Sequence, residues 1–295
     1  MGIFRFNYRS QAYGGHLDIT VVIPNDGYSY LPPEKRATTH PIPGRTPMQL
    51  PSLVPGMKFQ TIYLLHGGGD DDTLVYRDTR AEMYARQNRV MLVTPSIVNS
   101  FGADTAYGVR YMTFVTEELP VLIQTLFPSS PKREDNFIMG FAMGGNAALG
   151  CALMHPHRYA ACVDMSGGIG FTPRPEMLAD ELRSDHFKNH MKLYEATFGA
   201  PETIVGGPYD LAAVIRKAQA EGVELPKLHM VLGEKEFIFN RVMGDYEALK
   251  KLGVDVDLTV EPGGDHDFDL WDKYIKYSMT HFFPLKRKAI LPGEQ

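Results

Sequence analysis

The hydrophobic positions of this chain follow two kinds of pattern. Short, nearly continuous apolar runs are typical of strands that are buried on both faces of a sheet. Longer stretches have apolar residues at every third or fourth position, as on one face of a helix. Strands are predicted at 61–65, 90–95, 136–140, 159–166, 227–233 and 254–261, and helices at 78–87, 117–127, 144–155, 245–252 and 270–282. This alternation predicts an α/β fold, a mostly parallel sheet with helices on both faces.

Two segments interrupt the alternation. Seven prolines lie between residues 27 and 56, and proline at this density disfavours both helices and strands. We interpret 27–57 as a proline-rich surface excursion between two early strands, for which a linker, a lid and an arm of a homo-oligomer are all open. Residues 171–222 are more than one crossover between strands requires and predict a helical insertion. The whole chain, 1–295, is interpreted as a single domain.

Composition and charge exclude several classes of protein. The net charge is −5 and no long basic run occurs, which argues against a nucleic-acid or membrane-surface partner. Two cysteines, Cys151 and Cys162, cannot build a disulfide scaffold. No apolar stretch reaches the roughly 18 residues of a membrane span, and the first residues lack the apolar core of a signal peptide. We therefore expect a cytoplasmic protein that acts on a small molecule.

One glycine pattern predicts a catalytic turn. Gly140-Phe141-Ala142-Met143-Gly144 lies between a predicted strand and a predicted helix. This matches the nucleophile elbow G-x-S-x-G, where glycines let strand and helix pack closely around a sharply turned nucleophile. The central residue here is Ala142 and not serine. A glycine-rich turn without chemistry is the alternative, but the other parts of such a site follow in the expected order.

Three further segments supply these parts. The run His66-Gly67-Gly68-Gly69 follows the strand at 61–65, where hydrolases of this type place an oxyanion-hole N–H. His266 lies in a glycine-rich loop after the last strand and suits a general base. Glu236, just after the strand at 227–233, is the preferred acid to orient it, with Glu234 and Asp210 as alternatives.

Two other histidines raise the question of a metal. His155 and His157 lie in a His-Pro-His-Arg segment, but no third ligand stands at a suitable spacing in the sequence. We interpret both as surface residues. Neither a metal nor an organic cofactor is expected.

These residues together resemble the esterase D group of α/β-hydrolases, nearest the branch of tributyrin, feruloyl and acetyl esterases. The resemblance covers about 62–282 and rests on the motifs at 64–68, 104–111, 117–120, 132–134, 140–145, 166–168, 236–237 and 264–271. It implies the α/β-hydrolase fold and a serine ester hydrolase. The nucleophile would stand at Ala142, the base at His266, and the oxyanion N–H donors at Gly68 and Met143. The family usually has aspartate at Glu236 and often tryptophan at Phe268.

The alanine is the decisive departure from the family. A methyl group cannot attack a carbonyl, so the chain with Ala142 should be nearly inactive as an esterase. Either serine was replaced to trap an uncleaved ester, or the protein is a natural pseudo-hydrolase that binds esters or partners without turnover. The retained His266, carboxylate and glycines favour the first explanation.

The substrate is expected to be a short-chain acyl ester or a hydroxycinnamoyl ester of the feruloyl type. Five aromatic residues are candidates for the pocket, although residues of this kind can equally belong to the core: Phe141, Tyr107, Phe237, Phe268 and Trp271. A thioesterase of the S-formylglutathione hydrolase kind is a further alternative, less favoured because the loop at His66 lacks cysteine.

Overall fold

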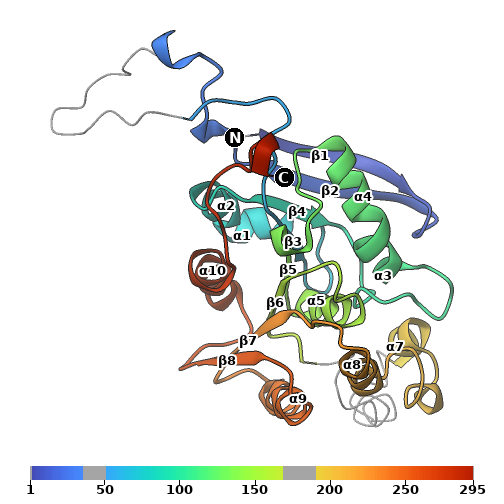
Figure 1. Ribbon diagram of the computed structural model, residues 1–295. Coiled ribbons are helices and arrows are strands. Elements are labelled where there is room, and N and C mark those ends of the chain that lie inside the picture. The colour runs from blue at the N-terminus through green and yellow to red at the C-terminus, as the bar shows by residue number, and fades with distance from the viewer. Residues whose placement is uncertain (1, 36–50, 169–190, 295) are drawn as a thin grey trace.

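Eight strands form one sheet, in the order β1-β2-β4-β3-β5-β6-β7-β8. The computed structural model describes residues 2–35, 51–168 and 191–294 (Figure 1). The strands from β4 to β8 across the sheet are parallel, whereas β1 and β2 are antiparallel. The bounds of the strands are Gly2–Ser10 (β1), Gly15–Ile23 (β2), Thr61–Leu65 (β3), Met91–Pro95 (β4), Asn136–Phe141 (β5), Ala161–Met165 (β6), Lys227–Gly233 (β7) and Val256–Glu261 (β8).

Helices cover both faces of the sheet, as the sequence predicted. The α-helices are Leu74–Asp78 (α1), Ala81–Gln87 (α2), Tyr111–Thr113 (α3), Leu119–Leu126 (α4), Met143–Met154 (α5), Met191–Phe198 (α7), Leu211–Ala220 (α8), Phe239–Lys251 (α9) and Phe268–Tyr277 (α10). Two π-helical turns, Phe114–Glu118 and Ser278–Phe282, extend α3 into α4 and prolong α10. Short 3-10 turns lie at Asn25–Gly27, Pro33–Lys35, Arg133–Asp135, Pro201–Thr203 and Pro292–Glu294.

The core has two halves because the side chains of each central strand alternate between the two faces. In β3, Tyr63 and Leu65 pack into one hydrophobic cluster with residues of α5 and α8. Ile62 and Leu64 pack into the other, with residues of α1, α2 and α10. Figure 1 shows α1, α2 and α10 on one side of the sheet and α4, α5 and α8 on the other. This double burial explains why the central strands read as continuous apolar runs.

Several predicted boundaries were wrong. The helix expected from residue 117 begins at Tyr111 and passes through the π-helical turn Phe114–Glu118, and the helix expected from 245 begins at Phe239. One strand was expected before the proline-rich excursion, whereas a hairpin of two strands, β1 and β2, lies there. Most side chains of β1 are partly or fully exposed, so this edge strand lacks the apolar run that marks a central strand.

Only parts of the two interrupting segments fall within the described residues. In the proline-rich excursion, Ser29 forms a β-bridge with Ser52 and a 3-10 turn follows at Pro33–Lys35, whereas 36–50 lie outside the description. In the predicted helical insertion, α7 and α8 are helical, and 169–190 lie outside the description.

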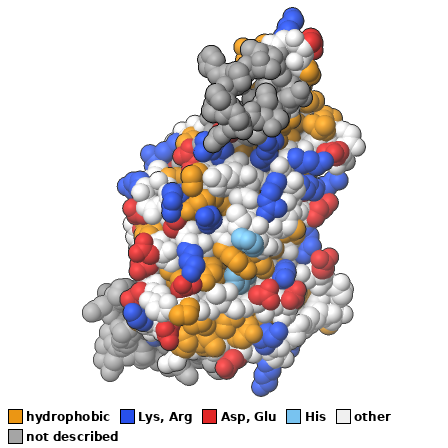
Figure 2. All heavy atoms as spheres, turned by 90° about the vertical axis from the view of Figure 1, so that its left-hand side faces the viewer, with side chains coloured by type: hydrophobic (Ala, Val, Ile, Leu, Met, Phe, Trp, Pro, Cys, Tyr) orange, Lys and Arg blue, Asp and Glu red, His pale blue; other side chains and the backbone are white. Residues whose placement is uncertain are grey.

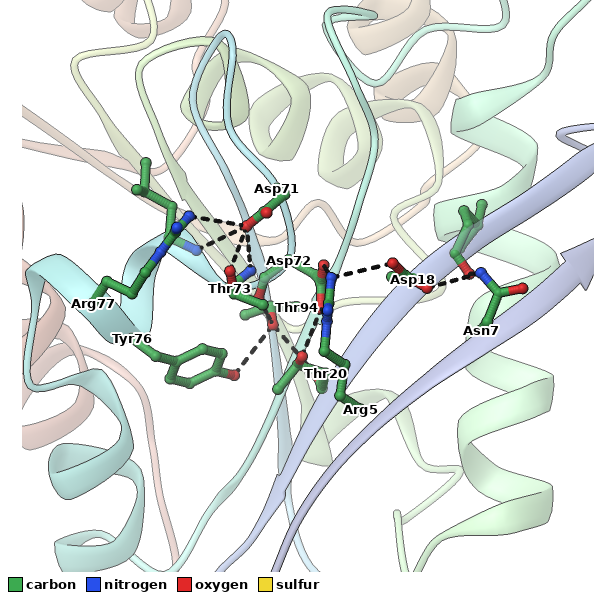
Figure 3. A network of polar contacts seen from close by, with 12 residues as sticks. Arg5, Asn7, Asp18, Thr20, Asp71, Asp72, Thr73, Tyr76, Arg77 and Thr94 are labelled. Atoms are coloured by element: carbon green, nitrogen blue, oxygen red, sulfur yellow. Dashed lines mark hydrogen bonds and ion pairs between the residues drawn. The ribbon is translucent and has the colours of Figure 1, made fainter.

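A polar network fastens the N-terminal hairpin to the loop that follows β3 (Figure 3). The buried carboxylate of Asp72 accepts two hydrogen bonds from Arg5, at 2.9 and 3.0 Å, and one from Thr20 at 2.6 Å. Thr94 of β4 donates to the Asp72 carbonyl at 2.7 Å. Because Arg5 and Thr20 belong to β1 and β2, the network fixes the far end of the glycine-rich loop that begins at His66.

The surface shows no dominant sign of charge on the face drawn in Figure 2, which is the left-hand side of Figure 1. Acidic, basic and hydrophobic side chains are interspersed there. Among the residues that the structure describes, each helix is too short or too polar to cross a bilayer.

Candidate active site

The chain turns sharply at Ala142, between β5 and α5. Ala142 has φ 50° and ψ −126°, a conformation that residues with a side chain rarely adopt. A Cβ on Gly140 would lie 2.1 Å from the carbonyl oxygen of Gly144, and one on Gly144 would lie 2.1 Å from that of Leu65. Both positions therefore require glycine. This geometry is that of a nucleophile elbow, with a methyl group at the position of the nucleophile.

The glycine loop after β3 lies directly beside this turn. A Cβ built on Gly67 would be 3.4 Å from the Cβ of Ala142. Gly68 and Met143 both line the same hollow. Their N–H groups donate no hydrogen bond to any group within residues 2–35, 51–168 and 191–294. Two backbone N–H groups that are free to donate and lie beside the same hollow suit the binding of an oxyanion.

His66 holds the near end of this loop. It is buried, its Nδ1 donates to the Gly67 carbonyl at 2.8 Å, and its Nε2 accepts from the Ile97 N–H at 2.9 Å. Burial lowers the pKa of His66, which favours the neutral ring that this arrangement requires. Asn99 supports the loop further by accepting from the Gly69 N–H at 2.6 Å. The sequence marked His66 only as part of a motif, and its positioning role was missed.

The structure brings His266 and Glu236 together. Nδ1 of His266 donates to Oε2 of Glu236 at 3.1 Å, and the Glu236 side chain is fully buried. Its other oxygen, Oε1, accepts from the Gly233 N–H at 2.8 Å and from the Ser166 hydroxyl at 2.6 Å. These bonds fix the carboxylate and place the proton of the imidazole on Nδ1, so that Nε2 carries the lone pair.

The two alternative acids lie elsewhere. Glu234 accepts from the Gly263 N–H at 2.8 Å on the outside of the loop. Asp210 caps α8 by accepting from the Ala213 N–H at 3.0 Å. Neither carboxylate has a hydrogen bond or ion pair to His266 in the described part of the chain.

A row of polar groups extends the contact between His266 and Glu236. Sequence reasoning named its residues but did not predict the hydrogen bonds that join them. The indole N–H of Trp271 donates to the Ser166 hydroxyl at 3.0 Å, which donates in turn to Glu236. Ser166 has φ 59°, a strained value that marks functional sites more often than ordinary loops. Its position directly after β6, on the same sheet edge as the elbow, was the available signal.

One buried carboxyl group lies behind these residues. Asp164 of β6 is fully buried, and burial raises the pKa of its carboxyl group to about 7, an effect that Glu236 strengthens. Neither oxygen has a hydrogen bond of good geometry within the described residues, and the nearby Gly167 N–H offsets only part of the effect of burial. Sequence reasoning did not single out this group, because the strand pattern alone does not assign a role to an aspartate within it.

A hollow of about 600 Å³ opens over the elbow, a size typical of sites for small molecules. Of the five aromatic candidates, Phe237, Phe268 and Trp271 line it. Phe141 does not, because it points into the core, is fully buried and stacks on Trp271 with ring centroids 4.8 Å apart. Tyr107 also lies outside the wall and is 60% exposed.

Charged side chains also reach this hollow. Asp70, Arg241 and Asp267 lie in its wall, and burial raises the pKa of Asp70. None of the three was singled out from the sequence.

The sheet order, the elbow after β5 and a histidine loop after β8 define an α/β-hydrolase fold. The sequence profile of the family described as "Putative esterase" matches residues 45–197. An acetyl esterase of Caldicellulosiruptor saccharolyticus is 30% identical over 237 residues, covering 77% of this chain and 87% of that protein. The chain therefore belongs to this esterase family.

Solved structures agree with this assignment. The substrate-bound serine hydrolase FphF of Staphylococcus aureus aligns with a TM-score of 0.75 and 28% identity, over 95% of this chain and 97% of that one. An S-formylglutathione hydrolase (FrmB) of the same organism aligns with a TM-score of 0.73 and 27% identity, over the same shares of the two chains. Both neighbours are hydrolases, so hydrolysis is the activity for which the site should be tested.

Proposed function

We propose that this chain has the framework of a serine carboxylic-ester hydrolase whose nucleophile position holds Ala142. In this form it binds short-chain acyl or hydroxycinnamoyl esters and hydrolyses them scarcely at all. The observation that carries the proposal is the convergence of three segments on Ala142. These are the glycine loop at 67–68, the strained turn that holds Ala142, and His266, which lines the same hollow and is hydrogen-bonded to the buried Glu236.

With serine at position 142, the reaction would be a two-step acyl transfer. The serine hydroxyl attacks the ester carbonyl while Nε2 of His266 takes its proton, and Glu236 stabilises the imidazolium. The N–H groups of Gly68 and Met143 hold the negative charge that develops on the carbonyl oxygen. His266 then protonates the leaving alcohol, and water activated by the same histidine releases the acid. All these steps use side chains and backbone of this chain.

The expected activity follows from the missing oxygen. Removal of the nucleophile of a serine protease lowers kcat by about 10⁶-fold. The Ala142→Ser variant should therefore turn over esters several orders of magnitude faster than the chain with alanine. Ala142→Ser should also need no repacking, because the methyl group lines the hollow.

The test is a hydrolysis panel of acetyl, butyryl and feruloyl esters, run with the parent chain and with Ala142→Ser. The double variant Ala142→Ser/His266→Ala is the matched control, which should remain near the parent rate because the serine then lacks its base. The ester that is cleaved fastest identifies the acyl pocket. If Ala142→Ser hydrolyses no member of the panel, the proposed mechanism is wrong.

The alanine itself favours a second candidate, a natural pseudo-hydrolase that binds an ester or a partner without turnover. This candidate predicts that both forms bind an ester equally and that neither cleaves it. A thioester activity is the third, supported by the S-formylglutathione hydrolase neighbour. S-formylglutathione therefore belongs in the panel, and its preferential cleavage by Ala142→Ser would favour this activity over an esterase.

A further inference from the structure

The two histidines of the His-Pro-His-Arg segment meet a carboxylate from another part of the fold. Nδ1 of His155 lies 3.5 Å from Oε1 of Glu117, and Nε2 of His157 lies 3.8 Å from the same oxygen. The three atoms all lie within 4.8 Å of one another. The sequence offered no third ligand because Glu117 belongs to the π-helical turn before α4, whereas the histidines follow α5. Turns of this kind frequently occur at functional sites.

The spacing fits a tetrahedral zinc ion. Zinc bonds to nitrogen and oxygen of about 2.0–2.1 Å place neighbouring ligand atoms about 3.4 Å apart in a tetrahedron. The two distances to Glu117 are already near this value. Since the His157 side chain is largely exposed, rotation of its ring can close the remaining gap at low cost. Two imidazoles and one carboxylate suit zinc, whereas magnesium and calcium prefer oxygen ligands alone.

The surroundings leave the ligand atoms available. Nδ1 of His155 and Nε2 of His157 are the ring atoms nearest to Glu117, and a neutral imidazole offers a metal the lone pair of such an atom. Arg158 contacts Oε2 of Glu117, which leaves Oε1 facing the histidines. Its positive charge also opposes a nearby cation, so we expect weaker binding than in a closed structural zinc site.

We propose that Glu117, His155 and His157 form a binding site for one zinc ion, with water as the fourth ligand. The site is separate from the hollow over Ala142, because the two lie at opposite ends of α5, a helix about 18 Å long at 1.5 Å per residue. Bound zinc ties the end of α5 to the turn that precedes α4. The ion acts here as a cross-link between two elements.

The test is a titration of the full chain, free of any polyhistidine tag, with Zn²⁺ by calorimetry at neutral pH. Co²⁺ is the spectroscopic probe, because a tetrahedral site gives it intense visible absorption. We expect one ion per chain and a higher melting temperature with zinc. Loss of an outer-shell group already weakens metal sites about 10–100-fold, so His157→Ala and Glu117→Gln should each weaken binding at least that much.

His281→Ala is the matched control, since this exposed histidine lies outside the cluster, and it should bind zinc as the parent does. Circular dichroism of each apo variant separates loss of a ligand from loss of the fold. The proposal is overturned if the parent shows no saturable binding, or if His157→Ala binds as tightly as the parent. It is also overturned if binding disappears in His266→Ala instead, since the ion then occupies the hollow.

Discussion

Replacement of Asp164 by asparagine should stabilise the protein, and by an amount that grows with pH. The carboxyl group lies between the first turn of α5 and the segment after β6: a Cβ on Gly145 or Gly167 would come within 2.3 or 2.2 Å of its Oδ1. Burial raises its pKa from 3.8 to about 7. Ionisation is thus disfavoured in the folded protein relative to the unfolded chain.

The sign and size of the effect follow from proton linkage. Below pH 4 the carboxyl group is neutral in both states and imposes no penalty. As the pH rises from 4 to 7 the unfolded chain gives up this proton and the folded protein keeps it, so stability falls, and above pH 7 the penalty is constant. A shift of about three pH units corresponds to about 4 kcal/mol at 1.36 kcal/mol per unit. Asparagine has nearly the same shape and no such penalty.

The assay is urea unfolding of the parent and Asp164→Asn at pH 4.5, 5.5, 6.5 and 7.5, because the other titrating groups cancel in the difference. The gain in unfolding free energy should be small at the lowest pH and approach about 4 kcal/mol at the highest. Asp135→Asn is the contrasting control. That buried carboxylate accepts from Lys286 and Ser130, both at 2.7 Å, so its replacement should destabilise. If Asp164→Asn shows a difference independent of pH, or a loss of stability at pH 7.5, the reasoning about Asp164 is refuted.

Two further predictions concern the elbow and the acid. Ala142→Gly should raise the unfolding free energy by about 1 kcal/mol, since relief of a strained backbone worth about 1–3 kcal/mol outweighs the roughly 0.5–1 kcal/mol cost of glycine. Urea unfolding measures this, and a destabilised glycine variant would contradict it. In the Ala142→Ser background, Glu236→Gln should lower kcat by about 10⁴-fold with little change in KM, because an amide disfavours the required tautomer. Steady-state kinetics with the ester that is cleaved fastest measures this. A kcat within tenfold of that of Ala142→Ser, a difference of about 1.4 kcal/mol in the barrier, would contradict the prediction.

The predictability of the fold depended on burial. Strands β3 and β7 were predicted with their observed ends because nearly every side chain in them is buried. Strand β1 was missed because it is a sheet edge whose exposed side chains carry little pattern. The π-helical turn Phe114–Glu118 was also missed, since the helix predicted from residue 117 began inside it.

Some residues of the candidate site could be predicted from local sequence motifs, whereas the roles of others depend on tertiary contacts. The elbow could be predicted because its glycine spacing is a local motif, although only one of the two contacts behind it is local: Gly140 would meet Gly144, whereas Gly144 would meet Leu65 of β3. The choice between Glu234 and Glu236 depends on Ser166 and the Gly233 N–H, which only the folded chain brings to one carboxylate. The contact of Glu117 with His155 is likewise tertiary. The sequence could not tell whether an aromatic residue near the elbow lines the hollow or packs in the core. Phe268 lines the hollow, whereas Phe141 packs in the core.

The strain at Ala142 bears on how the site came to lack a nucleophile. Strained backbone of this kind persists where the surrounding structure holds it in place, and it clusters at functional sites. Here the strained backbone persists, together with two obligatory glycines and a fully buried Glu236 that accepts the hydrogen bond of His266. A surface that only bound a partner would need none of these features. The alanine side chain differs from serine by one oxygen atom, while every group that would act on that oxygen is retained. Within the proposed function, these retained groups support replacement of a serine over a long-established binding role, and recovery of turnover in Ala142→Ser separates the two.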